Sequence, residues 1–426
     1  MRGAVDATNA EFAIRNAECI GERRTADDLP VKLRIPHSAF HVAGVALSVL
    51  AILIATLRPT GDFVATGWSF SLASGDKATA EVIENLLLFL PLGISLALGS
   101  NTRPLRAIAV GALLSLAVEV AQQWIPGRDP SVGDLILNTT GTAAGVLIAR
   151  TAPRWLAPAP TRAAWLSLAS AVFTATVWLG TGWLLEPQLP AANALEIRAP
   201  DLGPHMDLYS GQVLSVTGRL GAREPVRIVA TAGTPSGRLA PILDVDDGPG
   251  PAGTIVAADR TDLVLLIRSR SMFWDLDRPD LRARGALAGV APGDTITITA
   301  RTDQPGRTFC LAQDARESCG LGYTIGDGWK LIFFPDHFTP WALRVLNAMW
   351  VGGALLGVGL WGRRHAASGV ALLLAATTLA LGPGLVRLQP TPLGEWVGGV
   401  TGLTIGWLAW RGRYRVMFLR APPPSL

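Results

Sequence analysis

Cysteine, lysine and charge are all scarce in this chain, and each shortage excludes a class of protein. The 426 residues include three cysteines, and 16% of them are charged against 49% that are hydrophobic. Three cysteines are too few for a disulfide scaffold or a structural zinc site, whereas a soluble protein carries roughly 25% charged residues. Residues 1–36 also lack the apolar core of a secretory signal peptide. We therefore expect a polytopic membrane protein with a water-facing part, without a metal or other cofactor.

Long hydrophobic runs predict about eight transmembrane helices, since a helix needs about 20 residues, and at least about 17, to cross a bilayer. The predicted spans are residues 40–57, 82–98, 105–124, 135–148, 163–185, 341–361, 366–381 and 393–410. This pattern divides the chain into a polar tail (1–36), a five-helix membrane domain (37–185), a polar domain (186–340), three further helices (341–411) and a second tail (412–426).

Basic residues in the short loops set the orientation, because cytoplasmic loops are enriched in lysine and arginine. With the N-terminus inside, twelve basic residues flank the cytoplasmic ends and four lie outside, at Arg58, Lys77, Arg128 and Arg387. The bias predicts a cytoplasmic-membrane protein with both tails in the cytoplasm and residues 186–340 outside. The net charge of +4 therefore reflects topology, and we expect no nucleic-acid partner.

Residues 186–340 have the pattern of an antiparallel β-sandwich. Residues 294–300 alternate strictly between polar and apolar, as a half-buried strand does, and further candidate strands are 213–220, 225–230 and 263–269. Short strands separated by Gly- and Pro-rich turns are typical of a sandwich. The spacing resembles a concanavalin-A- or laminin-G-like jelly roll, which would bind a carbohydrate or a partner.

Three smaller features of the polar domain allow two interpretations each. Cys310 and Cys319 are predicted to form a disulfide, with two free thiols as the alternative, because disulfides persist outside the cytoplasm. The acidic triplet at Asp244, Asp246 and Asp247 is interpreted as a turn rather than a calcium site. Four aromatic residues are interpreted as an interfacial belt rather than a sugar platform; they are Trp329, Phe333, Phe334 and Trp341.

Polar residues within the apolar runs are the main functional signal. A charged residue at the centre of a membrane helix costs roughly 2.5 to 3.5 kcal/mol, so such residues face a bundle interior and often mark a site. The candidates, besides Glu84, are Asn85, Glu119, Gln122, Arg128, Asp134 and Asn138. In the predicted topology all of them share one outer layer, and we expect Arg128 to pair with Asp134 or Glu119. Helix–helix adhesion is the alternative interpretation.

Small residues at helical spacing predict close packing of helices. Asp134, Gly141 and Gly145 have offsets of 0, 7 and 11, and Glu395, Gly402 and Gly406 repeat these offsets. Together with Gly398, these glycines are predicted packing positions. The last span is therefore either a degenerate copy of the fourth or a coincidence of Gly-rich helices. Pro91 and Gly93 are expected to interrupt the second span.

The array N85-x3-F89-x-P91-x-G93, followed by E119-x2-Q122-x5-R128-x5-D134-x3-N138-x2-G141-x3-G145, resembles the VanZ-like family over about residues 40–150. The resemblance implies a small multi-span membrane unit without an assigned reaction, whose namesake is associated with resistance to the glycopeptide teicoplanin.

Two functions, and a less favoured third, follow from these patterns. The first is a non-enzymatic envelope protein that binds an amphiphile, such as a lipid-linked precursor or lipoglycopeptide, in the outer polar pocket. The second is a lipid headgroup enzyme in which Glu119 or Asp134 acts as acid/base and Arg128 holds a phosphate. No metalloprotease, nucleophile-elbow or P-loop motif supports the second. A transporter would require polar residues as far as the inner face. The sequence does not specify the oligomeric state.

Overall fold

The computed structural model describes most of the chain between residues 37 and 418. The described residues are 37–59, 67–72, 77–99, 103–189, 196–198, 206–218, 220, 225–246, 253–304, 307–333 and 338–418. The predicted N-terminal tail therefore lies outside the described residues, as does most of the C-terminal tail.

Eight α-helices lie within the described residues, close to the eight predicted spans. They are α2 (His37–Thr56), α3 (Ala78–Leu98), α4 (Pro104–Gln122), α5 (Val132–Leu156), α6 (Pro160–Leu185), α7 (Pro340–Trp361), α8 (Ala366–Leu385) and α9 (Leu393–Phe418). Six of them, α3 to α8, are long and apolar enough to cross a membrane, and residues His41–Thr56 of α2 form a shorter apolar helix. This is a multi-pass membrane protein; α2 and α9 remain predicted spans.

Local sequence explains where several helices begin. Proline occupies the first turn of α4, α6 and α7, where its missing N–H would have no helical partner anyway. Ser131 caps α5, with its hydroxyl oxygen accepting a hydrogen bond from the Asp134 N–H at 3.3 Å. Pro91 does not interrupt the second span as predicted, since it lies inside a continuous α3.

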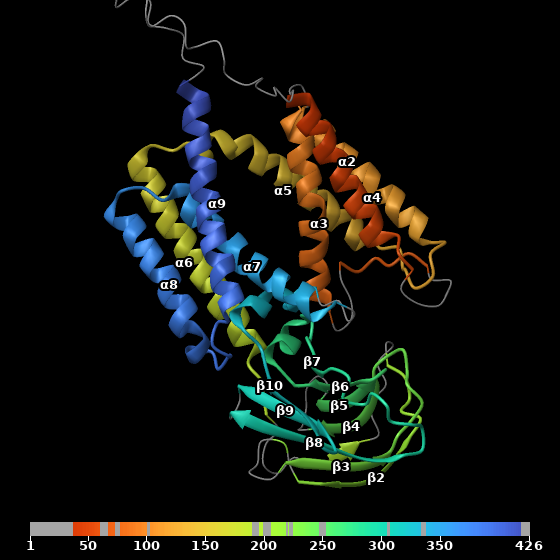
Figure 1. The fold of residues 1–426 in the computed structure, drawn as a ribbon. Helices are drawn as coiled ribbons and strands as arrows, with labels where there is room; N and C mark the ends of the chain where they lie inside the picture. Colours follow the sequence, from red (N-terminus) through yellow and green to blue (C-terminus); the bar gives the residue numbers. More distant parts are fainter. Residues whose placement is uncertain are drawn as a thin grey trace, which may run out of the picture.

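The helices form two bundles (Figure 1). In the first bundle, α5 packs against α3 and α4, and α2 packs against α3. In the second bundle, α7 packs along α9 and against α6, while α8 packs on α6. The chain completes the first bundle, enters the second through α6, forms the β region and then returns through α7 to α9.

The β region contains two antiparallel sheets of five strands each. One sheet has the order β1-β4-β5-β6-β7, and the other has the order β10-β9-β8-β3-β2. The strands are β1 (Glu196–Arg198), β2 (Gln212–Thr217), β3 (Val226–Thr231), β4 (Ala240–Asp246), β5 (Thr254–Asp259), β6 (Asp262–Leu266), β7 (Leu281–Ala283), β8 (Thr295–Gln304), β9 (Thr308–Gln313) and β10 (Arg316–Leu321). Two 3₁₀ helices, η1 (Arg270–Trp274) and η2 (Ile325–Leu331), contact the second bundle.

Alternating apolar residues of both sheets form one core. Ile228 on β3 and Ile298 on β8 are fully buried, and they share a cluster with Leu263 and Leu265 of β6 in the other sheet. Ile228 and Ile298 are also register partners across the β3–β8 ladder. The predicted antiparallel sandwich is thus confirmed.

The first bundle contacts the β region at one end and the second bundle at the other. The N–H groups of Thr79 and Ala80, at the start of α3, donate to the carbonyl of Asp275 after η1, and Lys77 forms an ion pair with Asp277. At the far end the indole N–H of Trp361 on α7 donates to the Trp155 carbonyl of α5 at 2.6 Å.

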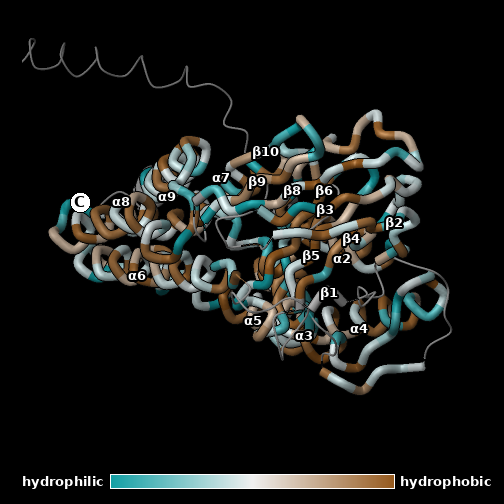
Figure 2. Tube along the Cα trace, turned by 90° about the horizontal axis from the view of Figure 1, so that it is seen from below, coloured by the Kyte–Doolittle hydropathy of each residue, from teal (hydrophilic) through white to brown (hydrophobic). Residues whose placement is uncertain are grey.

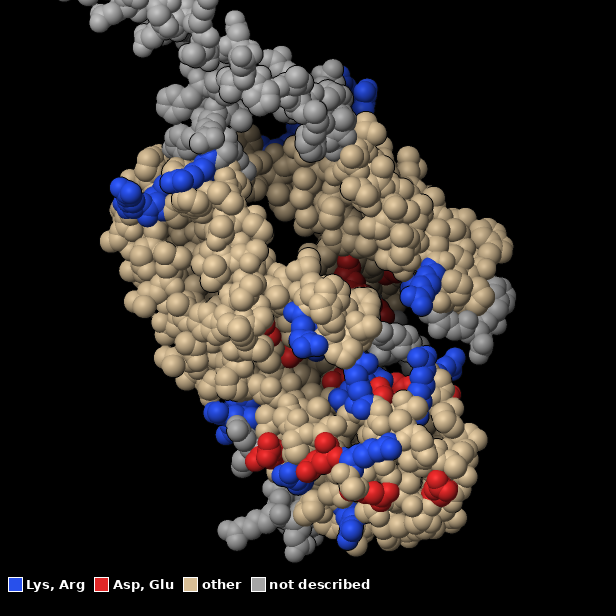
Figure 3. Space-filling model, in the orientation of Figure 1, with Lys and Arg blue, Asp and Glu red and all other residues tan. Residues whose placement is uncertain are grey.

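Apolar and charged residues are distributed according to this division into helix bundles and a β region. Hydrophobic residues run along the helices of both bundles (Figure 2), and large apolar side chains such as Leu47, Leu113, Phe173 and Leu373 are exposed on them. On the face shown in Figure 3, charged side chains concentrate on the β region and at the ends of the helices, leaving a broad belt without them. The exposed apolar belt contacts the lipid bilayer.

One expectation about the β region needs correction and one is confirmed. The indole N–H of Trp329 donates to the Asn347 side-chain oxygen at 2.8 Å, and the interfacial aromatic belt stays a prediction. Asp244 lies within strand β4 rather than in a turn, and Asp247 is outside the described residues. Cys310 and Cys319 form the predicted disulfide.

Candidate functional site

Asn85 and Asp134 form the centre of the predicted polar cluster. The Asn85 side-chain amide on α3 donates to Oδ1 of Asp134 on α5 at 2.9 Å. Asp134 is in the first turn of α5, where the positive end of the helix dipole favours a carboxylate. Among the described residues no donor reaches Oδ2 of Asp134, so this oxygen retains its capacity to accept a hydrogen bond.

Glu119 and Gln122, both buried on α4, have structural partners. A carboxylate oxygen of Glu119, which is 1% exposed, accepts a hydrogen bond from the Ser131 N–H at 2.8 Å and thereby holds the start of α5. The Gln122 side-chain amide donates to the Thr56 carbonyl at the end of α2 at 3.1 Å. Oε1 of Gln122 is buried and receives no hydrogen bond from the described residues.

Arg128, in the loop between α4 and α5, does not form the predicted ion pair. Its guanidinium instead donates to the Arg58 carbonyl at 3.1 Å and to the Ala55 carbonyl at 2.9 Å. These carbonyls lie at the end of α2, where backbone oxygens lack helical partners. Burial lowers the pKa of Arg128 below its usual value, and the nearby charges of Asp134, Glu84 and Glu119 partly offset this. The arginine thus belongs to the cluster, but as a helix cap rather than an ion-pair partner.

Asn138 faces α4, away from the other polar residues of α5. Its side-chain amide donates to the Ser115 hydroxyl at 3.0 Å, while its buried Oδ1 has no partner within the described part of the chain. The packing glycines of the same helix face α3, since a Cβ at Gly141 would lie 2.4 Å from the Leu86 carbonyl oxygen. Asn138 and Gly141 therefore contact two different neighbouring helices, α4 and α3.

These six residues together connect all four helices of the first bundle near the ends that face the β region. Figure 3 shows a hollow between the two bundles above the β region, with acidic side chains deep inside it. Glu84, one residue before Asn85 on α3, has no hydrogen-bond partner among the described residues. Asn85, Gln122, Asn138 and Arg128 each donate hydrogen bonds within the bundle. Oδ2 of Asp134, Oε1 of Gln122 and Oδ1 of Asn138 are acceptors that receive no hydrogen bond from the described residues.

A second polar cluster, centred on Glu395 of α9, is not apparent from the sequence alone. Glu395 is 2% exposed and accepts a hydrogen bond from the Thr324 hydroxyl at 2.5 Å and from the Gly326 N–H at 3.1 Å. The Asn347 side-chain amide of α7 donates to Asp327 at 2.9 Å. The segment containing η2 thus reaches from the β region into the second bundle. Asn347, a lone amide in an apolar span, was the signal that could have indicated this cluster.

The helix pairs α3/α5 and α7/α9 are built alike. A Cβ at Gly141 or Gly145 of α5 would collide with carbonyl oxygens of Leu86 or Leu90 on α3. At the matching offsets on α9, a Cβ at Gly402 or Gly406 would collide with carbonyl oxygens of α7, as would one at the predicted packing glycine Gly398.

The correspondence extends to the opposite helix of each pair. A Cβ at Gly93 of α3 would lie 2.1 Å from the Thr142 carbonyl oxygen, and one at Gly359 of α7 would lie 2.1 Å from that of Leu403. Thr142 and Leu403 each follow the matching glycine of α5 or α9. The repeated offsets in the sequence therefore correspond to repeated packing, and Asp134 and Glu395 occupy equivalent places.

A comparison with protein families finds a match to the first bundle. Residues 38–153 match the VanZ/LLP1 family model. The match covers α2 to most of α5, and the β region and second bundle lie outside it. No curated protein and no solved structure matches the chain, so the concanavalin-like nature of the sandwich stays a prediction. The VanZ-like segment contains all six polar residues of the first cluster.

The described residues provide one grouping of metal-ligating side chains, formed by Cys310, Glu317 and Cys319. Both sulfurs of this group are already joined in the disulfide, so they are not free to act as thiolate ligands.

Proposed function

We propose that this protein binds an amphiphile whose headgroup carries hydroxyl or amide donors, at the polar cluster of the VanZ-like segment. A lipid-linked saccharide precursor or a lipoglycopeptide has this chemistry. The cluster would face the extracytoplasmic side of the cytoplasmic membrane, together with the β region. The disulfide supports this orientation, because disulfides persist in oxidising compartments, and so does the bias of basic residues toward the opposite ends of the spans.

The comparison of Asp134 with Glu395 carries the proposal. In the second bundle the Glu395 carboxylate receives its donors from the chain itself: the Thr324 hydroxyl, the Gly326 N–H and, at 3.4 Å, the Asn347 side-chain amide. In the first bundle the equivalent carboxylate receives only Asn85 among the described residues. A partly buried carboxylate oxygen without a donor is costly, and a ligand that offers hydroxyl or amide groups would satisfy it as η2 satisfies Glu395.

The other unpaired groups favour the same ligand chemistry. Oε1 of Gln122 and Oδ1 of Asn138 are buried acceptors to which no described residue donates. Such groups usually find a donor from the protein, from water or from a ligand. Binding is favoured over acid/base catalysis by Glu119, since one carboxylate oxygen of Glu119 is held by the Ser131 N–H.

The test is a binding assay on the purified full chain in detergent with labelled polyprenyl-linked saccharide. We expect saturable binding that weakens by at least about tenfold in Asp134→Ala, the equivalent of about 1.4 kcal/mol. The matched control is Asp303→Ala, which removes an exposed carboxylate that pairs with Arg301 in the β region. Unchanged affinity in Asp134→Ala would remove the proposed site, and chemical turnover of the labelled lipid would favour the enzyme hypothesis instead.

A further inference from the structure

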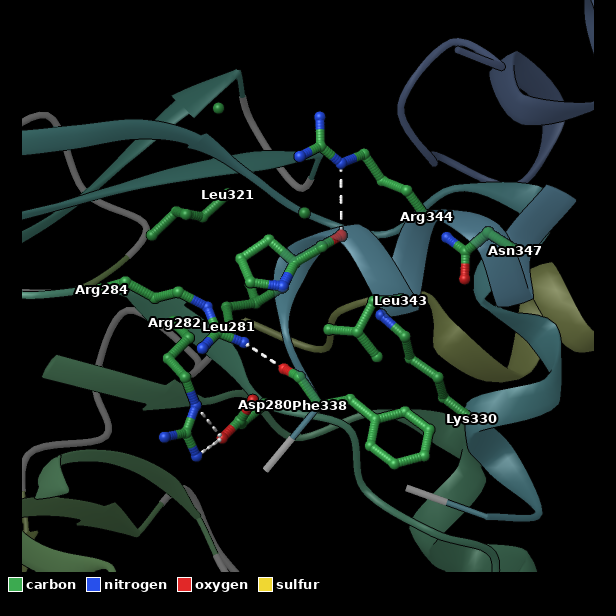
Figure 4. Close-up of a pocket in the computed structure, with 13 residues that line it drawn as sticks. Asp280, Leu281, Arg282, Arg284, Leu321, Lys330, Phe338, Leu343, Arg344 and Asn347 are labelled. Carbon is green, nitrogen blue, oxygen red and sulfur yellow. Dashed lines mark hydrogen bonds and ion pairs between the residues drawn. The ribbon is translucent and has the colours of Figure 1, made fainter. Parts of the chain in front are cut away.

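A cavity of about 440 Å³ lies between the β region and the start of α7. Its walls come from β7, β10, η2 and the first two turns of α7, and basic side chains converge on it (Figure 4). None of the six polar residues of the VanZ-like segment lines this cavity. It is therefore separate from the site of the proposed function and does not depend on it.

Four cationic side chains line the cavity, and two of them are neutralised within the protein. Arg282 forms ion pairs with Asp259 at 2.5 Å and with Asp280 at 2.6 Å. Lys330 forms an ion pair with Asp327 at 2.5 Å. These two side chains are nearly buried, at 11% and 12% exposure, and they act as structural charges.

The remaining two cations, Arg284 and Arg344, have no carboxylate partner among the described residues. Arg284 donates to the Phe338 carbonyl at 2.9 Å, and Arg344 donates to the Pro340 carbonyl at 3.2 Å. A guanidinium carries five N–H donors, so both retain donors as well as a full positive charge. The cavity therefore offers two guanidinium groups to an anion.

The position of the cavity relative to the membrane decides which anion fits. Arg344 is four residues after Pro340, where α7 begins, which places it about 6 Å along a helix that is long and apolar enough to span the bilayer. Phe338 and Trp341 are exposed beside it, at 36% and 69%. Aromatic side chains of this kind occupy the headgroup level of a membrane, so the cavity opens where phosphate groups of lipids lie.

We propose that this cavity binds the phosphate of an anionic lipid headgroup, in the leaflet on the side of the β region. Arg284 and Arg344 contact the phosphate oxygens, since planar guanidinium groups match phosphate geometry and form charge-assisted hydrogen bonds. The aromatic residues beside the cavity hold the acyl part at the interface, so that the β region is fixed to the membrane surface at the base of the second bundle.

The experiment measures retention of labelled phosphatidylglycerol by the purified full chain in a zwitterionic detergent. Phosphatidylcholine and inorganic phosphate serve as competitors. We expect phosphatidylglycerol to bind in preference to phosphatidylcholine, and the double variant Arg284→Gln/Arg344→Gln to lower its affinity by at least about tenfold. Arg284→Lys/Arg344→Lys retains the charge but loses the planar fork, so we expect an intermediate affinity.

The matched control is Arg316→Gln, an exposed arginine on β10 that donates to the Ala288 carbonyl away from the cavity, and its affinity should equal that of the wild type. The elution volume on size exclusion confirms that each variant is folded. Equal affinity of the double glutamine variant and the wild type would overturn the proposal, as would equal binding of the two lipids. Competition by inorganic phosphate as strong as that by the lipid would overturn the lipid assignment and leave a free-phosphate site.

Discussion

The two helix bundles are packed in the same way and differ in the groups that donate hydrogen bonds to the buried carboxylate. Both place small residues where α5 crosses α3 and where α9 crosses α7, and both place an acid seven residues before the first matched glycine. In the second bundle the acid is covered by η2 from the β region. In the first bundle the acid, Asp134, receives one hydrogen bond from the described residues, donated by Asn85. The comparison shows that one helical frame serves as an attachment point in one bundle and as a candidate binding site in the other.

Replacing a glycine at a helix crossing with a larger residue is expected to cause the largest loss of stability. The loss should be similar in both bundles. A Cβ at Gly402 would lie 1.9 Å from the Gly352 carbonyl oxygen, and one at Gly141 would lie 2.4 Å from that of Leu86. Neither backbone can move without separating the helices, so Gly402→Val and Gly141→Val should each cost about 3 kcal/mol or more. The yield of monodisperse full-length protein and its thermal unfolding in detergent measure this loss.

Gly353→Ala provides the control, because a Cβ there meets nothing within 4 Å. Close packing of the two bundles would not be equivalent if Gly141→Val were tolerated while Gly402→Val was not.

Removal of the two equivalent acids should lower the unfolding free energy by different amounts in the two bundles. Glu395→Ala leaves the Gly326 N–H without its acceptor and leaves the Thr324 hydroxyl with Asp327 alone. We therefore expect a loss of about 2 to 3 kcal/mol in unfolding free energy. Asp134→Ala frees only Asn85, which should cost about 1 kcal/mol. Chemical denaturation of both variants beside the wild type gives the two values. A cost for Asp134→Ala as large as that for Glu395→Ala would show that both acids are structural.

A variant at Arg128 tests whether this residue stabilises the first bundle by capping α2. Arg128→Ala releases the carbonyls of Ala55 and Arg58 at the end of α2, which should cost about 1 to 2 kcal/mol because these hydrogen bonds involve a charged donor. Arg58→Ala is the control, since its own backbone carbonyl remains in place. A variant at Arg128 that unfolds like the wild type would refute the capping role.

Acidification below about pH 4 should weaken the contact between the second bundle and the β region through Asp327. We expect this loss of stability to be the smallest of the series. Burial acts to raise the pKa of Asp327, but the charge of Lys330 and hydrogen bonds from Lys330, Thr324 and Asn347 hold the pKa below its ordinary value. Its folded pKa is therefore lower than its unfolded pKa. The stabilisation is present above about pH 4 and is lost as the pH falls through the folded pKa. A tenfold difference in proton affinity between the folded and unfolded states corresponds to about 1.4 kcal/mol of unfolding free energy.

Thermal unfolding of wild type and Asp327→Asn across this acidic range measures the contribution. The wild type should lose more stability on acidification than the variant does. Parallel curves for the two proteins would assign the acid sensitivity to other groups.

The sequence predicted the spans and the sandwich because their signals are local. Apolar runs of sufficient length mark the helices, and strict alternation at residues 294–300 marked β8, which runs from Thr295 to Gln304. The proximity of Asn85 and Asp134 followed from placing costly polar residues at one depth. The helical offsets of Glu395, Gly402 and Gly406 likewise indicated the second crossing.

The sequence could not provide contacts that depend on where distant elements end. Arg128 caps α2, and this requires knowing that the carbonyls of Ala55 and Arg58 lie near a loop some 70 residues later in the chain. Thr324 reaches Glu395 across 71 residues, and nothing local to either residue indicates the other. Asp134 and Asn138 share a face by spacing, but the position of α4 beside α5 directs Asn138 to Ser115.

Chemical accessibility of the two equivalent acid positions distinguishes an open site from a filled one. In a Cys19→Ser background, Asp134→Cys and Glu395→Cys are compared for their rate of reaction with a membrane-impermeant thiol reagent in intact cells. We expect Asp134→Cys to react from outside and to be protected by the polyprenyl-linked saccharide, whereas Glu395→Cys stays unreactive beneath η2. An unreactive Asp134→Cys, or equal reactivity at both positions, would contradict the distinction between the two bundles.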